Sequence, residues 1–506
     1  MPHTARQSAR LRSLEHLCFS NSFAHLPEDF FARVLPTPLA APYLISFNPA
    51  AAALIDLDPA EAERPDFPVI FNGGKLLPGS APIATLYAGH QFGHYVPQLG
   101  DGRAIILGEI LTQNGARWEL QLKGAGQTPF SRGGDGRAVL RSTIREYLCS
   151  EAMHGLGIPT TRALCMIGSD EEVYRESIET GAMLLRMAPS HVRFGSFEVF
   201  YYRNRFDALR TLADYLIAHH YPELGDRTDR YLALYREVVV RTARLLADWQ
   251  LVGFAHGVMN TDNMSVLGLT LDYGPFGFMD DYEPGFVCNH SDHHGRYAFD
   301  RQPEIALWNL SCLGQAMLPL FDERAEAAAE QATAQFDAYR EAFQARYQAG
   351  LRAKLGLRDS RPGDMELADR LLAQMAAERR DYTGTWRRLA GFNSAQSAVQ
   401  PASLRNHFID REAFDRWADD YGTRLRAEHS RDAARRAAMN RVNPKYVPRN
   451  YLAQTAIERA RDCRDYSEID RLLRVLQTPY DEHPEDEDLA EPPPDWGRAL
   501  AVSCSS

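Results

Sequence analysis

The chain has 506 residues, with 56 Lys or Arg against 67 Asp or Glu, so its formal net charge is −11. This acidic balance excludes a protein that binds nucleic acid through a basic surface. Hydrophobic residues make up 45% of the chain, which is an ordinary value for globular domains. Charged residues or histidines interrupt every apolar run before the roughly 18 residues that a membrane span needs. We therefore expect a cytoplasmic protein that has neither a secretory signal nor a membrane segment.

The first two regions of the chain, residues 1–80 and 81–205, differ in the pattern of their apolar residues and glycines. Residues 1–80 are predicted to form an N-terminal extension that shows no recognisable chemistry. Between 81 and 205, short apolar runs broken by glycines predict strands and turns. Strands are expected over 104–109 and 118–123. The second strand alternates apolar and polar residues, which places Lys123 on its polar face.

Helices dominate the rest of the chain. We expect a second large unit over 206–400 and a helical region over 401–480. Residues 481–495 contain eight acidic residues and three consecutive prolines but no Lys or Arg. This composition predicts that 481–506 is a flexible, solvated acidic tail, which ends near Cys504.

Two glycine-rich stretches flank the predicted strands. Gly100 and Gly102 precede the first strand and would let the backbone approach a phosphate, to which Arg103 could donate charge-assisted hydrogen bonds. A plain β-turn is the alternative for this short pattern. A second stretch, which includes Asp135 and Gly136, follows the second strand.

Lys123 and Glu146 have the spacing of a pair found in protein kinases. Lys123 ends a strand, and Glu146 lies 23 residues further on in a helix predicted over 142–154. In kinases, a strand lysine paired with a helix glutamate binds the nucleotide phosphates. We expect the two side chains to form an ion pair. The alternative is a surface lysine and a solvated glutamate.

The segment 256–274 carries the most specific pattern. A turn near Gly268 is predicted to return Asp272 close to Asn263, which brings together two oxygen ligands suited to Mg²⁺ or Mn²⁺. Asp262 is then available as a base. Asp272 begins an Asp-Tyr-Gly sequence that resembles the kinase Asp-Phe-Gly, although no His-Arg-Asp loop precedes it.

Two arginines and a histidine-rich segment are the remaining candidate site residues. Arg186 and Arg193 stand seven residues apart and offer two guanidinium groups to phosphate oxygens. Residues 289–294 hold three histidines, but adjacent ligands rarely converge on one zinc ion. A hydrogen-bonded loop is the better interpretation of that cluster.

Taken together, these strings resemble the selenoprotein O family of protein adenylyltransferases. The resemblance covers 87–308, including 288–292, and resumes over 443–454. It implies an α+β protein with a protein-kinase-like two-lobed fold, whose N-lobe would be 81–205 and whose C-lobe would be 206–400. N-terminal and helical C-terminal extensions would flank the lobes.

The resemblance also implies an activity and a set of site residues. ATP would bind in the reverse orientation to that in kinases, so that AMP passes to Ser, Thr or Tyr hydroxyls of proteins and pyrophosphate leaves. UTP is a possible second co-substrate. Asp262 would be the catalytic base, and Asn263 and Asp272 would hold Mg²⁺ or Mn²⁺. The residues expected to contact ATP are Gly100, Gly102, Arg103, Lys123, Asp135, Gly136, Arg186, Arg193 and Asp272.

Two other functions stay open, and so does redox control. The chain can also be read as a conventional phosphotransferase or as a non-catalytic nucleotide-binding scaffold. Some family members carry selenocysteine near the C-terminus, where this chain has Cys504. A disulfide between Cys504 and Cys288 would clasp the tail over the catalytic lobe, whereas a reducing cytosol favours an unpaired tail cysteine.

Overall fold

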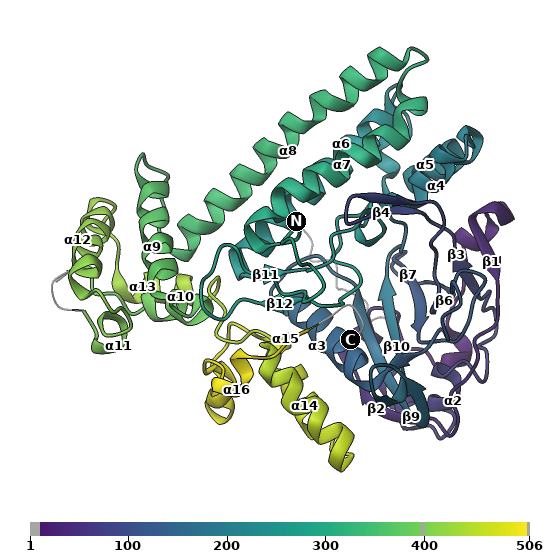
Figure 1. The fold of residues 1–506 in the computed structure, drawn as a ribbon, viewed down its shortest axis with the longest axis horizontal. Coiled ribbons are helices and arrows are strands. Elements are labelled where there is room, and N and C mark those ends of the chain that lie inside the picture. Colours follow the sequence, from purple (N-terminus) through teal and green to yellow (C-terminus); the bar gives the residue numbers. More distant parts are fainter. Residues whose placement is uncertain (1–10, 396–399, 503–506) are drawn as a thin grey trace, which may run out of the picture.

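The computed structural model describes residues 11–395 and 400–502 and shows a mixed α+β protein (Figure 1). Its main sheet has the strand order β1-β3-β6-β7-β10-β9-β2, with β8 paired to β10. These strands pair antiparallel. They are β1 (Phe31–Arg33), β2 (Tyr43–Phe47), β3 (Ile83–Thr85), β6 (Ala104–Leu111), β7 (Arg117–Lys123), β8 (Ala138–Val139), β9 (Arg162–Tyr174) and β10 (Ile178–Ala188).

Two small antiparallel ribbons lie outside this sheet. They are β4 (Gly89–Gln91) with β5 (His94–Val96), and β11 (Phe254–Ala255) with β12 (Gly277–Phe278). Short 3-10 helices connect many of the elements: η1 (Leu14–His16), η2 (Phe23–His25), η3 (Glu28–Phe30), η4 (Pro59–Glu63), η5 (Pro222–Leu224), η6 (Thr261–Asn263), η7 (Phe299–Arg301) and η8 (Pro484–Ala490).

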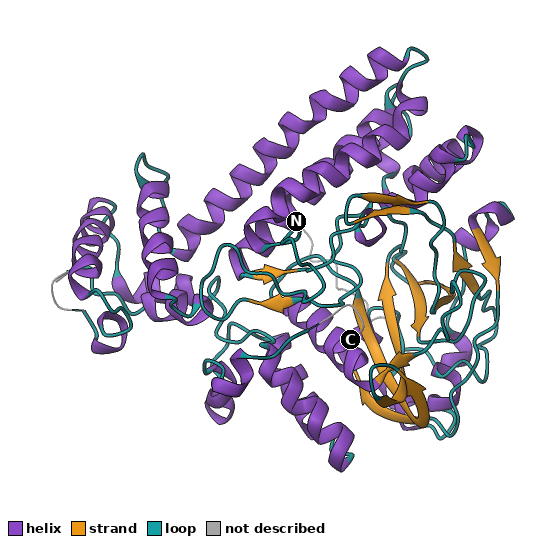
Figure 2. Ribbon diagram, viewed as in Figure 1, coloured by secondary structure: helices purple, strands orange, loops and turns teal. Residues whose placement is uncertain are grey.

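Helices cover the sheet and make up most of the second half of the chain (Figure 2). In the first half they are α1 (Pro49–Ala53), α2 (Phe67–Phe71), α3 (Leu140–Gly155), α4 (Phe194–Tyr202), α5 (Phe206–His220) and α6 (Arg230–Val252). In the second half they are α7 (Gln302–Phe321), α8 (Ala325–Lys354), α9 (Asp364–Glu378), α10 (Tyr382–Leu389), α11 (Ala402–Arg405), α12 (Arg411–Ala427), α13 (Asp432–Asn440), α14 (Asn450–Cys463), α15 (Ser467–Gln477) and α16 (Asp495–Arg498). Figure 1 shows α9 to α13 grouped at one end of the long helix α8.

The central strands β6 and β7 extend the two that the sequence predicts, and the turn between them includes Gly115 at φ +84°. The polar face of β7 is buried like its apolar face, since Glu119 is 2% exposed and Gln121 is fully buried. Buried polar side chains need hydrogen-bond partners, and Glu119 accepts from His191 while Gln121 accepts from Arg186.

Helix α3 holds Glu146 against the sheet. Its apolar residues, among them Ile144 and Leu148, share one core with Leu184 of β10 and with α14 and α15. A second core fills the other face of the sheet under α1 and α2. Because α3 is packed on both sides, Glu146 is fixed relative to the end of β7.

The acidic segment 481–495 differs from its expectation as a solvated tail. It contains η8, in which Asp486 and Leu489 are each only 2% exposed. Arg471 of α15 pairs with Asp486 and Asp488, and Lys445 pairs with two further carboxylates of the segment. The prediction was wrong here because the neutralising cations come from an earlier part of the chain, which local composition does not reveal.

Lys354, at the end of α8, is a buried titratable residue that should make the stability of the fold depend on pH. It is 3% exposed, and its ammonium lies 4.9 Å from the ring centre of Trp386. Burial lowers the pKa of Lys354 from 10.5 to about 7. Between these values the unfolded chain binds the extra proton, so stability should rise with pH across this window.

We expect the free energy of unfolding of the wild type to rise relative to that of Lys354→Met between pH about 7 and about 10, by a few kcal/mol at most. Urea unfolding of both proteins at several pH values measures this difference. Parallel pH profiles for the two proteins would contradict the expectation.

Candidate active site

A cleft of about 660 Å³ lies between the glycine-rich turns of the sheet and the loops that follow β11. The sequence-predicted residues that line it are Gly100, Gly102, Arg103, Lys123, Asp135, Gly136, Arg186, Asp262, Asn263 and Asp272. Arg193 and Glu146 are buried beneath these residues and contact them. The cleft therefore brings together side chains that are far apart in the sequence, such as Arg103 and Asp272, which are separated by 169 positions.

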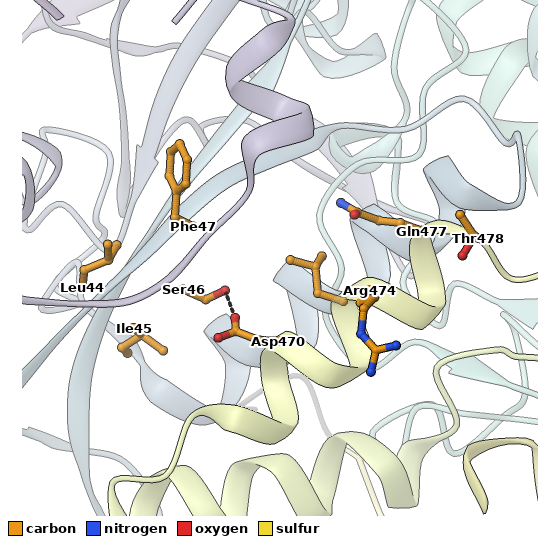
Figure 3. A pocket seen from close by; sticks show the side chains of 9 residues that line it. Leu44, Ile45, Ser46, Phe47, Asp470, Arg474, Gln477 and Thr478 are labelled. Atoms are coloured by element: carbon orange, nitrogen blue, oxygen red, sulfur yellow. Dashed lines mark hydrogen bonds between the residues drawn. The ribbon is translucent and has the colours of Figure 1, made fainter. Parts of the chain in front are cut away.

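A separate cavity of about 670 Å³ lies between β2 and α15 (Figure 3). The Ser46 hydroxyl donates a hydrogen bond to Asp470 across it, at 2.7 Å. None of the sequence-predicted site residues is among those that line this cavity in the described part of the chain. The chemistry predicted from the sequence therefore belongs to the first cleft.

The turn before β6 is packed against the second glycine-rich loop. Gly100 has φ +126°, and a Cβ at this position would lie 2.6 Å from the ring of Phe130. A Cβ on Gly102 would lie 2.8 Å from the carbonyl oxygen of Phe130. These close approaches keep both backbone segments at the wall of the cleft.

Gly136 offers a sharp test of this packing. It has φ +71°, and a Cβ there would overlap the carbonyl group of Gly126. We expect Gly136→Ala to raise the KM for ATP at least about tenfold, because a shift of about 1 Å in a binding loop is enough for such losses. Gly133→Ala is the matched control, since Gly133 has φ +83° but open space around its Cβ position. Equal effects of the two substitutions would show that backbone strain, not the overlap, matters.

Lys123 and Glu146 form the ion pair expected from the sequence. Glu146 also binds Arg186, at 3.0 Å, so one carboxylate holds two cations. Burial lowers the pKa of Lys123, while the charge of Glu146 acts in the opposite direction. The Lys123 ammonium has three N–H donors, so its one carboxylate partner leaves donors for another anion.

Asp272 joins this network from the opposite side of the cleft. Its carboxylate accepts from Arg186 at 2.6 Å and from Arg193, and its own backbone has φ +56°. Burial acts to raise the pKa of Asp272, but the charges of Arg193, Arg186 and Lys123 outweigh it and hold the pKa well below its usual range. Asp272 is thus an anion fixed between cations.

Asp262 and Asn263 lie side by side in η6. The Asn263 amide donates to the carbonyl of Val258 at 2.9 Å, which orients the amide oxygen away from that contact. Asp262 Oδ2 accepts from Gln91 at 3.1 Å, and burial raises the pKa of Asp262 to about 6. An antiparallel bridge between Met264 and Thr270 returns the chain to Asp272, as the predicted turn requires.

Arg193 lies beneath the cleft and not on its wall. It was expected to contact ATP, yet it is 2% exposed and is not among the residues that line the cleft. It donates to the backbone carbonyl of Asp262 at 2.7 Å and to the carboxylate of Asp272. Arg193 thereby connects the expected base to the expected metal ligand.

Among the polar residues that line the cleft, Arg175, Asp101 and Gln91 were not predicted from the sequence. Asp135 pairs with Arg175 of the β9–β10 hairpin, and Asp101 accepts from the backbone and hydroxyl of Thr85. Gln91 reaches Asp262 from β4. None of these contacts follows from sequence spacing, although Asp101 lies inside the recognised glycine-rich turn.

The histidine-rich segment is a hydrogen-bonded loop, as predicted. Asp292 accepts from the backbone amides of Arg296 and Tyr297, at 2.9 and 2.7 Å. Nowhere in 11–395 or 400–502 do three or more His, Cys, Asp or Glu side chains form a group that could hold a metal ion. Asn263 and Asp272 nevertheless fit Mg²⁺ or Mn²⁺ carried by a nucleotide, because such ions take most of their ligands from phosphate and water.

Cys504 lies outside the described residues, so its pairing with Cys288 stays a prediction. Cys288 is buried, and the nearby amide of His290 donates to the carbonyl of Val502 at 2.8 Å.

We expect reductant to change the transfer activity of the wild type but not that of Cys504→Ala. Cys463→Ala, which removes an exposed cysteine of α14, is the control. A reductant response that persists in Cys504→Ala would refute the predicted disulfide between Cys504 and Cys288.

A protein family and several named relatives match this chain over most of its length. The family described as "Protein adenylyltransferase SelO" matches residues 13–477. A protein of Myxococcus xanthus named "Protein nucleotidyltransferase YdiU" is 59% identical over 499 residues, which cover 98% of this chain and all of the relative. Proteins of the same name from Thioalkalivibrio sulfidiphilus and Thiobacillus denitrificans are 59% and 57% identical, each over 98% of this chain and all of the relative.

Proposed function

Since the chain belongs to the SelO family of protein adenylyltransferases, we propose that it transfers AMP from ATP to Ser, Thr or Tyr hydroxyls of proteins and releases pyrophosphate. One observation carries the proposal. The cleft brings two cationic side chains, Lys123 and Arg186, together with a buried carboxylate at Asp262. Nucleotidyl transfer needs both, because charge must be offset on the phosphates while a proton leaves the acceptor.

Each side chain has a role in this proposal. The glycine turn at Gly100–Arg103, Lys123 and Arg186 hold the triphosphate, with Asp135 and Gly136 in the facing loop. Asn263 and Asp272 would hold Mg²⁺ or Mn²⁺, which offsets phosphate charge when bound. Asp262 takes the proton of the acceptor hydroxyl. Arg193 acts from beneath, by fixing Asp262 and Asp272.

A protein-kinase-like, two-lobed arrangement is part of the same proposal. It is supported by an antiparallel sheet whose strand lysine pairs with a glutamate of α3. It is also supported by the order of Lys123, Glu146, Asn263 and Asp272 along the chain.

No helix in the described part of the chain has both the length and the apolar character of a membrane span.

Parallel reactions with α-labelled and γ-labelled ATP test the proposed reaction. Dephosphorylated casein provides acceptor hydroxyls, and products are separated by chromatography. We expect the α-label on protein, with one pyrophosphate released for each AMP attached. Transfer of the γ-label with stoichiometric ADP would instead establish a conventional phosphotransferase. Nucleotide binding without transfer of either label, with Mg²⁺ or Mn²⁺ present, would establish a scaffold.

The same assay extends to the base of the nucleotide. Replacing ATP by α-labelled UTP measures whether the cleft also accepts a pyrimidine. The groups assigned above contact phosphate rather than base, so they provide no discrimination of their own between the two nucleotides.

A further inference from the structure

The hairpin of β4 and β5 lies directly against the loop that carries Asp262. Two backbone amides of the hairpin donate to side chains of the loop: that of His90 to Thr261 Oγ1 at 2.7 Å, and that of Phe92 to Asn260 Oδ1 at 3.2 Å. Between them, the side chain of Gln91 donates through Nε2 to Asp262 Oδ2 at 3.1 Å. Three successive hairpin residues therefore bind three successive residues of the loop.

The hairpin is held tightly in this position. A Cβ on Gly89 would lie 2.7 Å from Asp262 Oδ1 and 2.9 Å from Asp262 Cβ, so only glycine permits this approach. On the other side, the His90 ring contacts the buried carboxylate of Glu198 at 2.9 Å. The backbone that carries Gln91 is thus fixed from both sides.

The two carboxylate oxygens of Asp262 have different surroundings. Oδ2 accepts the hydrogen bond from Gln91. Oδ1 is buried and has no hydrogen-bond partner among the described residues. Oδ1 faces Gly89, where a Cβ would lie 2.7 Å away, so the hydrogen bond from Gln91, which lines the cleft, is the contact that fixes the rotation of the carboxylate.

We propose that Gln91 is a positioning residue for the transfer reaction: by binding Asp262 Oδ2 it fixes the orientation of the carboxylate that receives the proton of the acceptor hydroxyl. The inference rests on the proposed function, in which Asp262 is the base. In the step, the hydroxyl oxygen bonds to the α-phosphorus and its proton passes to the Asp262 carboxylate. The bond from the α-phosphorus to the bridging oxygen breaks, and its electron pair leaves with pyrophosphate.

Gln91→Leu removes the donor and nearly preserves the side-chain volume. With α-labelled ATP and dephosphorylated casein, we expect kcat to fall by about tenfold to a hundredfold, because the base is no longer aligned. The KM for ATP and the thermal unfolding midpoint should be unchanged. Gln91→Met is measured alongside, since its unbranched chain fills the same space.

Gln98→Leu is the matched control, because Gln98 is exposed and is not among the cleft-lining residues. Its kcat should equal that of the wild type. A Gln91→Leu, Asp262→Asn double variant should be no slower than Asp262→Asn alone, because Gln91 acts only through Asp262.

Wild-type kcat in Gln91→Leu and Gln91→Met would overturn the inference. An equal loss on adding Gln91→Leu to the wild type and to Asp262→Asn would also overturn it. Failure of the proposed function gives a different result, since Asp262→Asn would then retain full turnover or the γ-label would be transferred.

Discussion

Asp272→Asn is expected to abolish nucleotidyl transfer and to weaken binding of the Mn²⁺–ATP complex severely. The substitution removes the only charged ligand in the proposed metal pair, so phosphate charge loses its compensation. It also removes the anion between Arg186 and Arg193, whose guanidinium groups are both buried. Titration of each protein with a fluorescent ATP analogue, with and without Mn²⁺, measures the binding loss.

Asparagine is preferred to alanine at this position. Both substitutions remove a charged partner of a buried ion pair, which costs about 3–5 kcal/mol, but the asparagine amide oxygen can still accept a hydrogen bond from a guanidinium group, whereas alanine has no acceptor. Asp229→Asn is the control, because Asp229 forms an exposed pair with Arg227 at 2.8 Å, outside the cleft. Its activity should match that of the wild type. Metal-dependent ATP binding that survives Asp272→Asn would refute the assignment.

Asp262→Asn should instead lower kcat by about 10²–10⁴-fold while ATP binding survives. The amide still accepts a hydrogen bond from Gln91 but cannot take a proton from the acceptor. The negative charge that it loses is one that burial already disfavours, so the fold should tolerate the change. Steady-state rates and equilibrium binding, measured on one preparation, separate the two effects. A parallel loss of ATP affinity and turnover would place Asp262 in nucleotide binding rather than in proton transfer.

Local spacing predicted the parts of the site that depend on neighbouring elements. A strand that ends at Lys123 and a helix that contains Glu146 needed only periodicity and one intervening loop. The turn between Asn263 and Asp272 was visible because Gly268 marks it. For these residues the path of the chain over a short distance determines which groups meet.

Other features depend on contacts between segments that are distant in sequence. Arg193 was expected in the cleft, but burial under η6 makes it a support for Asp262 and Asp272. Gln91 had no recognisable motif, because its role comes from a hairpin that docks on a loop 171 residues further along. Only the packed structure specifies such pairs.

The acidic segment 481–495 and the cleft both rely on ion pairs, but salt should act on them differently. Glu482 and Glu487, which bind Lys445, have side chains more than half exposed. Mobile ions screen such charges over a Debye length of about 8 Å at physiological ionic strength. The pairs of Glu146 and Arg186 are shielded from solvent. Ionic strength can therefore loosen the attachment of the chain's end, which leads toward Cys504, without disturbing the groups proposed to bind the nucleotide.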